Sequence, residues 1–218
     1  MSANKYLGII FDLDGVLCST DEYHYEAWKA IAEEIDINNF TPKDNNRQRG
    51  VSRMESLEIL LEKSERKFTD KEKLILADKK NQRYKELLNN INSFDLSDEV
   101  RVALNTLRKA GIKLAIGSSS KNAGLILERL GLGNFFDVVV DGNSITKSKP
   151  NPEVFLKAAQ MIGLQPSQCL VVEDAISGIE AGTAGGFDTA GIGGVMSYPK
   201  TTYPLRDFSQ IMNIVFAN

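Results

Sequence analysis

The chain has 218 residues, which is enough for one hydrophobic core or for a core domain that carries a smaller insertion. Its 42% hydrophobic and 25% charged residues are typical of a globular protein, and its net charge of −3 excludes the strongly basic surface of nucleic-acid and anionic-membrane binders. Two cysteines and one histidine exclude a disulfide scaffold and a multi-histidine zinc site. With no apolar run of membrane-spanning length and no signal-peptide pattern, we expect a cytoplasmic protein.

Short runs rich in β-branched residues alternate with helical patterns along most of the chain. The predicted strands are Tyr6–Phe11, Lys113–Gly117, Phe136–Val140, Cys169–Glu173 and Asp188–Ile192. The predicted helices are Asp98–Ala110, Lys121–Leu130, Pro152–Ile162 and Ile176–Gly182. Continuous apolar runs such as Leu170–Val172 suit strands that are buried on both faces. This alternation predicts an α/β fold, a Rossmann-like parallel sheet core with helices on both faces.

One long segment breaks the alternation. From about Asp21 to Asn90 the chain shows helical periodicity and no strand pattern. Its first helix has an apolar face made of Tyr23, Ala27, Ile31 and Ile35. A later helix begins at Thr69, which forms a predicted capping box with Glu72. We therefore predict a core domain of residues 1–17 and 94–218 and an inserted all-helical cap domain of residues 18–93.

Polar side chains follow four of the predicted strands at the point where each strand ends. In chain order they are Asp12 and Asp14, Ser118–Asn122, Lys149, and Glu173 with Asp174. Because the carboxyl ends of parallel strands meet at one edge of a sheet, we expect these groups to converge there. The carboxylates suit Mg²⁺, and the hydroxyls and amides after the second strand suit a phosphate. Each group taken alone also has a plainer explanation, such as a solvated turn or a helix cap.

Four short motifs occupy these positions. They are Asp12-Leu13-Asp14-Gly15, Ser118, Lys149-Pro150 and Glu173-Asp174. Their order resembles that of the four motifs of the haloacid dehalogenase superfamily. The resemblance implies Mg²⁺-dependent phosphoryl transfer through an aspartyl-phosphate, with Asp12 as nucleophile and Asp14 as general acid and base. It further implies that Ser118 and Lys149 stabilise the transferred group. The implied Mg²⁺ ligands are Asp12, the backbone carbonyl of Asp14, Glu173 and Asp174.

Three segments of the predicted cap carry a closer resemblance. Thr20–Lys29, Gly50–Arg53 and Lys79–Asn81 resemble the sugar-phosphate mutases of the same superfamily. This implies that His24 couples cap closure to Asp14, and that Arg53 binds the phosphate that is not transferred. The implied substrate contacts are Asp14, Trp28, Gly50, Val51, Ser52, Arg53, Lys80, Ser118, Ser119, Lys121, Asn122 and Lys149.

Two of these residues have a competing structural explanation. Trp28 lies on an amphipathic helix, where an indole is equally expected to pack in a core. Lys80 lies in a heavily charged helix, so a solvated face is a serious alternative. Cys18 departs from the expected small polar or β-branched residue, and we assign it no role.

The resemblance implies an isomerase that interconverts β-glucose 1-phosphate and glucose 6-phosphate through β-glucose 1,6-bisphosphate. A sugar-phosphate phosphatase of the same superfamily is the alternative, although a phosphatase needs neither a closing lid nor a second phosphate clamp. A phospho-acceptor module of the receiver type also groups aspartates, hydroxyls and a lysine at strand ends, but the helical insertion and the chain length argue against it. We expect a monomer with Mg²⁺ as cofactor and small-molecule sugar phosphates as partners.

Overall fold

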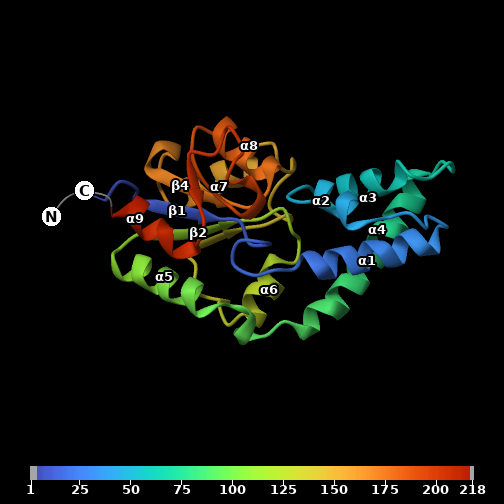
Figure 1. Ribbon diagram of the computed structural model, residues 1–218, viewed down its shortest axis with the longest axis horizontal. Helices are drawn as coiled ribbons and strands as arrows, with labels where there is room; N and C mark the ends of the chain where they lie inside the picture. Colours follow the sequence, from blue (N-terminus) through green and yellow to red (C-terminus); the bar gives the residue numbers. More distant parts are fainter. Residues whose placement is uncertain (1–3, 217–218) are drawn as a thin grey trace.

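The computed structural model describes residues 4–216, which form a parallel sheet surrounded by helices (Figure 1). The strand order is β3-β2-β1-β4-β5-β6, and every neighbouring pair is parallel. The strands are β1 Gly8–Phe11, β2 Lys113–Gly117, β3 Val138–Val140, β4 Cys169–Glu173, β5 Asp188–Ile192 and β6 Tyr203–Leu205. β1 therefore lies between β2 and β4, in the middle of the group of strands whose ends carry the predicted site.

The structure confirms β2, β4 and β5 with the predicted bounds and corrects the starts of two strands. β1 and β3 each begin two residues later than predicted, at Gly8 and Val138, where the regular ladder pairing starts. The preceding residues still touch the sheet, since the Leu7 amide donates to the Gln168 carbonyl at 2.9 Å. The sixth strand was not predicted, because Tyr203-Pro204-Leu205 is short and contains a proline. A proline is tolerated there because β6 is an edge strand.

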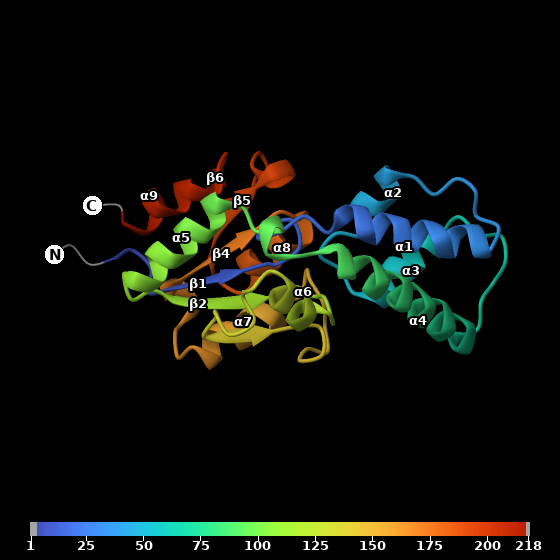
Figure 2. The ribbon, with the colours of Figure 1, turned by 90° about the horizontal axis from the view of Figure 1, so that it is seen from below.

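Helices cover both faces of the sheet, as predicted (Figures 1 and 2). The helices that correspond to the four predicted ones are α5 Asp98–Lys109, α6 Ala123–Arg129, α7 Glu153–Met161 and α8 Ile176–Ala184. A further helix, α9 Ile211–Val215, was not predicted. Alternate residues of β1 face opposite ways: Ile9 and Phe11 join one hydrophobic cluster, and Ile10 joins another. The first cluster includes side chains of α5, α6 and α9, and the second includes side chains of α7 and α8. A strand buried on both faces explains the continuous apolar runs in the sequence.

The inserted segment is wholly helical and lies beyond one end of the sheet (Figures 1 and 2). Its helices are α1 Asp21–Glu34, α2 Pro42–Arg47, α3 Arg53–Leu61 and α4 Asp70–Leu87. The predicted capping box is present at the start of α4, where the Glu72 amide donates to Thr69 Oγ1 at 3.3 Å. The short α2 was not predicted, because its Pro-Lys-Asp-Asn-Asn-Arg sequence has no apolar periodicity. The boundaries of a cap domain at residues 18–93 remain a prediction.

The inserted helices have a small hydrophobic cluster of their own, and Trp28 is nearly wholly buried in it. The prediction for the apolar face of α1 was partly right: Ala27 and Ile31 are buried, whereas Tyr23 and Ile35 are only half-buried. The larger cluster of the sheet continues into the insertion through Ala27, Tyr84 and Leu88. Buried apolar contact therefore extends across both connections between the insertion and the sheet.

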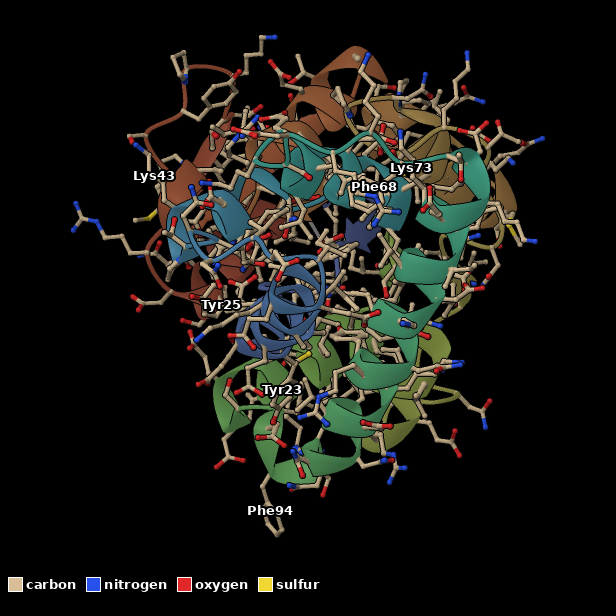
Figure 3. The ribbon with its side chains drawn as sticks, turned by 90° about the vertical axis from the view of Figure 1, so that its right-hand side faces the viewer. Tyr23, Tyr25, Lys43, Phe68, Lys73 and Phe94 are labelled. Carbon is tan, nitrogen blue, oxygen red and sulfur yellow. The ribbon has the colours of Figure 1, made fainter. Side chains whose placement is uncertain are left out.

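The second connection, Ile91–Asp98, contains a short 3-10 turn at Ser93–Asp95. Asn92 caps this turn and accepts from the Phe94 amide at 3.0 Å. Phe94 is 95% exposed and points away from the molecule, at the bottom of the view in Figure 3. Within residues 4–216, no helix is long and apolar enough to cross a membrane.

The turn from β4 into α8 depends on a glycine. A Cβ on Gly178 would lie 1.8 Å from Oε1 of Glu173, whose side chain is fully buried. Gly178→Ala should therefore lower the free energy of unfolding by about 1–3 kcal/mol, measured by urea denaturation. Gly124→Ala is the matched control, because Gly124 also lies in a helix and has no neighbouring atom within 4 Å of its Cβ position. The control should keep or slightly raise the stability, and equal losses in both variants would contradict this account.

Candidate active site

A cavity of about 940 Å³ lies between the carboxyl ends of the strands and the inserted helices. Asp12, Asp14 and Asp174 line its sheet side, and His24 and Arg53 are among the groups that line its helical side. The predicted site residues found in its wall are Asp12, Asp14, His24, Trp28, Gly50, Val51, Ser52, Arg53, Lys80, Ser118, Ser119, Lys121, Asn122 and Asp174. Lys149 and Glu173 are wholly buried and lie behind this wall. The structure thus brings residues from distant parts of the chain to one place.

Lys149 is a buried cation held between two acids. Its ammonium donates to Glu173 Oε1 at 2.6 Å and to Asp12 Oδ1. The other oxygen of Glu173 accepts the backbone amides of Asp174 and Ala175, at 2.8 and 2.9 Å. Both oxygens of Glu173 are therefore already bonded, and the chief role that the geometry gives this residue is to fix Lys149 and the turn after β4.

Asp12 and Asp174 are the carboxylates best placed to hold a metal ion. Oxygen atoms of Asp12, Glu173 and Asp174 lie within 4.8 Å of one another. Burial and the neighbouring Glu173 charge raise the pKa of Asp174 to about 7, and burial also raises the pKa of Asp12, against the opposing charge of Lys149. This excess of buried negative charge and the all-oxygen donor set fit Mg²⁺. The cation would favour the ionised form of both carboxylates.

Gly15 allows the first motif to approach the other acids. Its φ is +85°, a left-handed conformation, and a Cβ there would lie 2.1 Å from Asp174 Oδ2. The turn after Asp14 therefore runs against the carboxylate of Asp174. Only glycine satisfies both the backbone conformation and the space, which explains the Gly in the Asp-Leu-Asp-Gly motif.

Asp14 faces the inserted helices rather than Lys149. Its Oδ1 accepts a hydrogen bond from the Thr20 hydroxyl, and the Tyr84 hydroxyl lies 3.5 Å from the same oxygen. Nε2 of His24 lies 4.0 Å away. Burial raises the pKa of the Asp14 carboxyl, so that it holds a proton more readily than an exposed aspartate. This environment suits a group that gives and takes a proton.

Sequence reasoning missed Thr20 and Tyr84 as partners of Asp14. Thr20 was visible only as part of the cap motif, directly before α1. Tyr84 follows Lys80 by one helical turn, and this i, i+4 spacing was the only signal that both residues face the cavity.

Lys80 is buried, which excludes the alternative of a solvated face at this position. Its ammonium lies 2.8 Å from Nδ1 of His24. It also makes cation–π contacts with Trp28 and Tyr84, at 5.0 and 4.4 Å from the centroids of their rings. Burial and the nearby Arg53 charge lower the pKa of Lys80 to about 7. Burial and the Lys80 charge likewise hold the pKa of His24 well below its usual range.

The structure confirms that Trp28 packs in a core, and its contact with substrate stays a prediction. It packs in the hydrophobic cluster of the inserted helices, and it also lines the cavity below the Lys80 ammonium. Lys79, the residue beside Lys80, pairs instead with Glu34 on the exposed side of the helix.

Hydrogen bonds close the inserted helices onto the sheet edge. Ser119 Oγ donates to the Gly50 carbonyl at 2.8 Å, and Asn122 Nδ2 donates to Asn81 Oδ1 at 3.0 Å. Gly50 has a φ of +74°, and a Cβ there would lie 2.3 Å from Ser177 Oγ. The loop before α3 therefore rests directly on the core.

Arg53 is the first residue of α3, and Ser52 is the N-cap. The Ser52 hydroxyl accepts from the Glu55 amide at 3.3 Å, so it is already engaged in the cap of the helix. Arg53 is partly buried, and desolvation lowers the pKa of its guanidinium. A guanidinium without its full hydration shell is well suited to binding a phosphate dianion.

The turn after β2 is also preorganised. Ser118 Oγ accepts from the Ser120 amide at 3.0 Å, and Ser120 Oγ accepts from the Asn122 amide at 3.2 Å. The predicted helix start at Lys121 was wrong by two residues, because these side-chain bonds hold a non-helical turn before α6 begins at Ala123. Ser120, which was not among the predicted contacts, also lines the cavity.

Comparison with known proteins gives consistent matches. Residues 9–192 match the family model described as haloacid dehalogenase-like hydrolase. The chain is 42% identical over 187 residues to the β-phosphoglucomutase of Bacillus subtilis, covering 85% of this chain and 82% of that protein. It is 33% identical over 183 residues to a phosphorylated carbohydrates phosphatase of Thermotoga maritima, covering 83% of this chain and 82% of that one. The crystal structure of β-phosphoglucomutase from Clostridium difficile superimposes with a TM-score of 0.89 at 34% identity, over 94% of this chain and 93% of that chain.

The buried amine of Lys80 has a testable pH dependence. Its pKa of about 7 in the folded protein lies below the value of about 10.4 of an unperturbed lysine. Between those values the unfolded chain binds a proton that the folded chain does not, so this group makes the stability rise with pH across that window. Lys80→Met removes the amine. The stability of the variant relative to the wild type should therefore be higher at about pH 6 than at about pH 9, by at least about 1 kcal/mol.

Urea unfolding of both proteins at the two pH values measures this difference. Lys79→Met is the control, because Lys79 is exposed and its loss should leave the pH dependence of stability unchanged. The same pH response in both variants would contradict a buried amine at position 80.

Proposed function

The chain belongs to the haloacid dehalogenase-like hydrolase family, and on that basis we propose that it is a β-phosphoglucomutase. The proposed reaction interconverts β-D-glucose 1-phosphate and glucose 6-phosphate through β-glucose 1,6-bisphosphate, which makes the enzyme an isomerase. The observation that carries this proposal is the cavity between the sheet and the inserted helices, in which Asp12 is bonded to the core and Asp14 to the insertion. The two carboxylates thus have the separate environments that a nucleophile and an acid/base need.

In the proposed cycle, phosphorylated Asp12 transfers its phosphoryl group to the C6 hydroxyl of β-glucose 1-phosphate, and Asp14 accepts the proton of that hydroxyl. The resulting β-glucose 1,6-bisphosphate turns round inside the closed cavity. Asp12 then attacks the phosphorus at C1, the bond from that phosphorus to the C1 oxygen breaks, and Asp14 returns the proton to this oxygen. Glucose 6-phosphate leaves, and Asp12 is again phosphorylated.

The core supplies the charge for this transfer. We propose that Lys149 and Ser118 stabilise the oxygens of the transferred group, and that Lys149 also holds Asp12 in place. Asp12, Asp174 and the carbonyl of Asp14 would hold Mg²⁺, with Glu173 beside them. Bound Mg²⁺ offsets the repulsion between an anionic nucleophile and an anionic phosphate.

The inserted helices supply what distinguishes a mutase. We propose that Arg53, with Lys121 and Asn122 on the core side, binds the phosphate that is not being transferred, while Trp28, Lys80 and the Gly50–Ser52 loop contact the sugar. His24 would couple closure of the inserted helices to the position of Asp14, since it lies between Lys80 and that carboxylate. Closure also keeps water from the phosphoenzyme, which is what prevents net hydrolysis.

A sugar-phosphate phosphatase is the second candidate, because a relative with that named activity is 33% identical. In that case water would replace the sugar hydroxyl as the acceptor of the phosphoryl group. The family match argues against the receiver-type module, the third hypothesis raised by the strand-end residues.

Product analysis tests the choice between mutase and phosphatase. β-Glucose 1-phosphate with Mg²⁺ and a trace of β-glucose 1,6-bisphosphate should give glucose 6-phosphate with little inorganic phosphate, as followed by ³¹P NMR. Asp12→Asn should give neither product, because the amide cannot form the phosphoenzyme. Stoichiometric inorganic phosphate in place of glucose 6-phosphate would contradict the mutase proposal and favour the phosphatase.

Arg53→Ala tests the proposed distal clamp. Loss of a charged hydrogen-bond donor to phosphate should lower kcat/KM of the mutase reaction about 10- to 100-fold. Hydrolysis of a small phosphate ester, which has no second phosphate, should change far less. Arg66→Ala is the control, because Arg66 pairs with Glu72 on the exposed surface of the same inserted helices. Equal losses on the two substrates would mean that Arg53 is not the distal clamp.

A further inference from the structure

Arg49 makes contacts that the proposed reaction does not use. It lies between α2 and α3, and its guanidinium pairs with Asp21, the first residue of α1. Nη1 of the same guanidinium lies 3.6 Å from Oδ2 of Asp174, at the end of β4. One side chain of the insertion thus joins the beginning of α1 to the acid cluster of the core.

This contact directly concerns the cation site. The Asp174 side chain is only 10% exposed, and it is one of the acids that could hold a metal ion. A guanidinium at this distance neutralises part of the charge that would attract the ion. A divalent cation bound to Asp174 would in turn repel the guanidinium.

We infer that Arg49 is a cation-sensitive latch: it holds the inserted helices against Asp174, and it competes with Mg²⁺ for that carboxylate. The inference rests on the cation site of the proposed function. By reciprocity, if Arg49 weakens Mg²⁺ binding by some factor, Mg²⁺ weakens the latch by the same factor. Arg49 is therefore a positioning residue that couples the metal to closure.

The backbone around Arg49 is attached to the core independently of the Arg49 side chain. Its carbonyl accepts from Ser177 Oγ at 3.0 Å, and the next carbonyl, that of Gly50, accepts from Ser119 Oγ at 2.8 Å. These bonds do not involve the guanidinium. A substitution of the side chain should therefore keep these two hydrogen bonds and the fold, and remove only the ionic restraint that Asp174 adds to the loop.

Two carboxylates orient the guanidinium of Arg49. Asp21 holds it from the insertion, and Asp174 holds it from the core. The Nε atom is buried and has no hydrogen-bond partner among the described residues, so both carboxylates are served by the terminal nitrogens. If Asp174 is taken by a cation, Asp21 remains as the partner of Arg49.

Isothermal titration of the full chain with Mg²⁺ tests the competition. Arg49→Gln should bind Mg²⁺ about fivefold more tightly or better, because the competing charge is gone. Asp21→Asn should bind it more weakly, because the guanidinium then has only Asp174 as a partner. Arg47→Gln is the control and should match the wild type, since Arg47 pairs with Glu62 on the exposed surface. Opposite shifts from the two changes cannot result from a general loss of folding.

The outcomes separate this inference from the proposed function. Equal or weaker Mg²⁺ binding by Arg49→Gln overturns the latch and leaves the cation site standing. No Mg²⁺ binding by the wild type overturns the cation site, and the latch with it.

Hydrogen exchange of the backbone amides of residues 48–53 gives an independent readout. In the wild type, Mg²⁺ should raise the exchange of this loop, because it frees Arg49 from Asp174. In Arg49→Gln, Mg²⁺ should leave the exchange unchanged. The same change in both proteins, or slower exchange of the wild type with Mg²⁺, contradicts the latch.

Discussion

The buried ammonium of Lys149 is the interaction on which the rest of the site depends. Buried carboxylates gathered at the end of a sheet repel one another, and each is costly to bury without a counter-charge. Lys149 bonds to both Asp12 and Glu173. With Glu173 fixed, its second oxygen orders the turn into α8, and that turn carries Asp174 into the site.

The two aspartates of the first motif show how environment divides chemical roles. Asp12 and Asp14 are two residues apart, yet one bonds to Lys149 in the core and the other to Thr20, at the start of the insertion. Burial acts on both, but the neighbouring charges differ. The insertion therefore completes the surroundings of Asp14, which connects its proposed acid/base role to closure of the cavity.

Local sequence patterns predicted the central sheet well and its margins poorly. The bounds predicted for β2, β4 and β5 were right. β6 and α2 were missed because neither carries a hydrophobic period: one is a three-residue edge strand with a proline, and the other is a polar helix of six residues. Both exist because of neighbours distant in sequence, such as β5 for β6.

The sequence by itself determined which chemical groups stand at the strand ends, because the order of strands and the residues after them are local properties of the chain. It also determined that a helical insertion follows the first strand. Only the tertiary structure decided that Lys80 is buried beside His24, that Tyr84 reaches Asp14, and that Arg49 meets Asp174. Each of these contacts depends on how the inserted helices pack against one another and on the sheet. Lys80 and His24 are 56 positions apart in the sequence, and Arg49 and Asp174 are 125 positions apart. Contacts across such separations produce no periodic pattern in the sequence. The burial of a lysine and the partner of an arginine depend on which surfaces of the insertion and the core pack together.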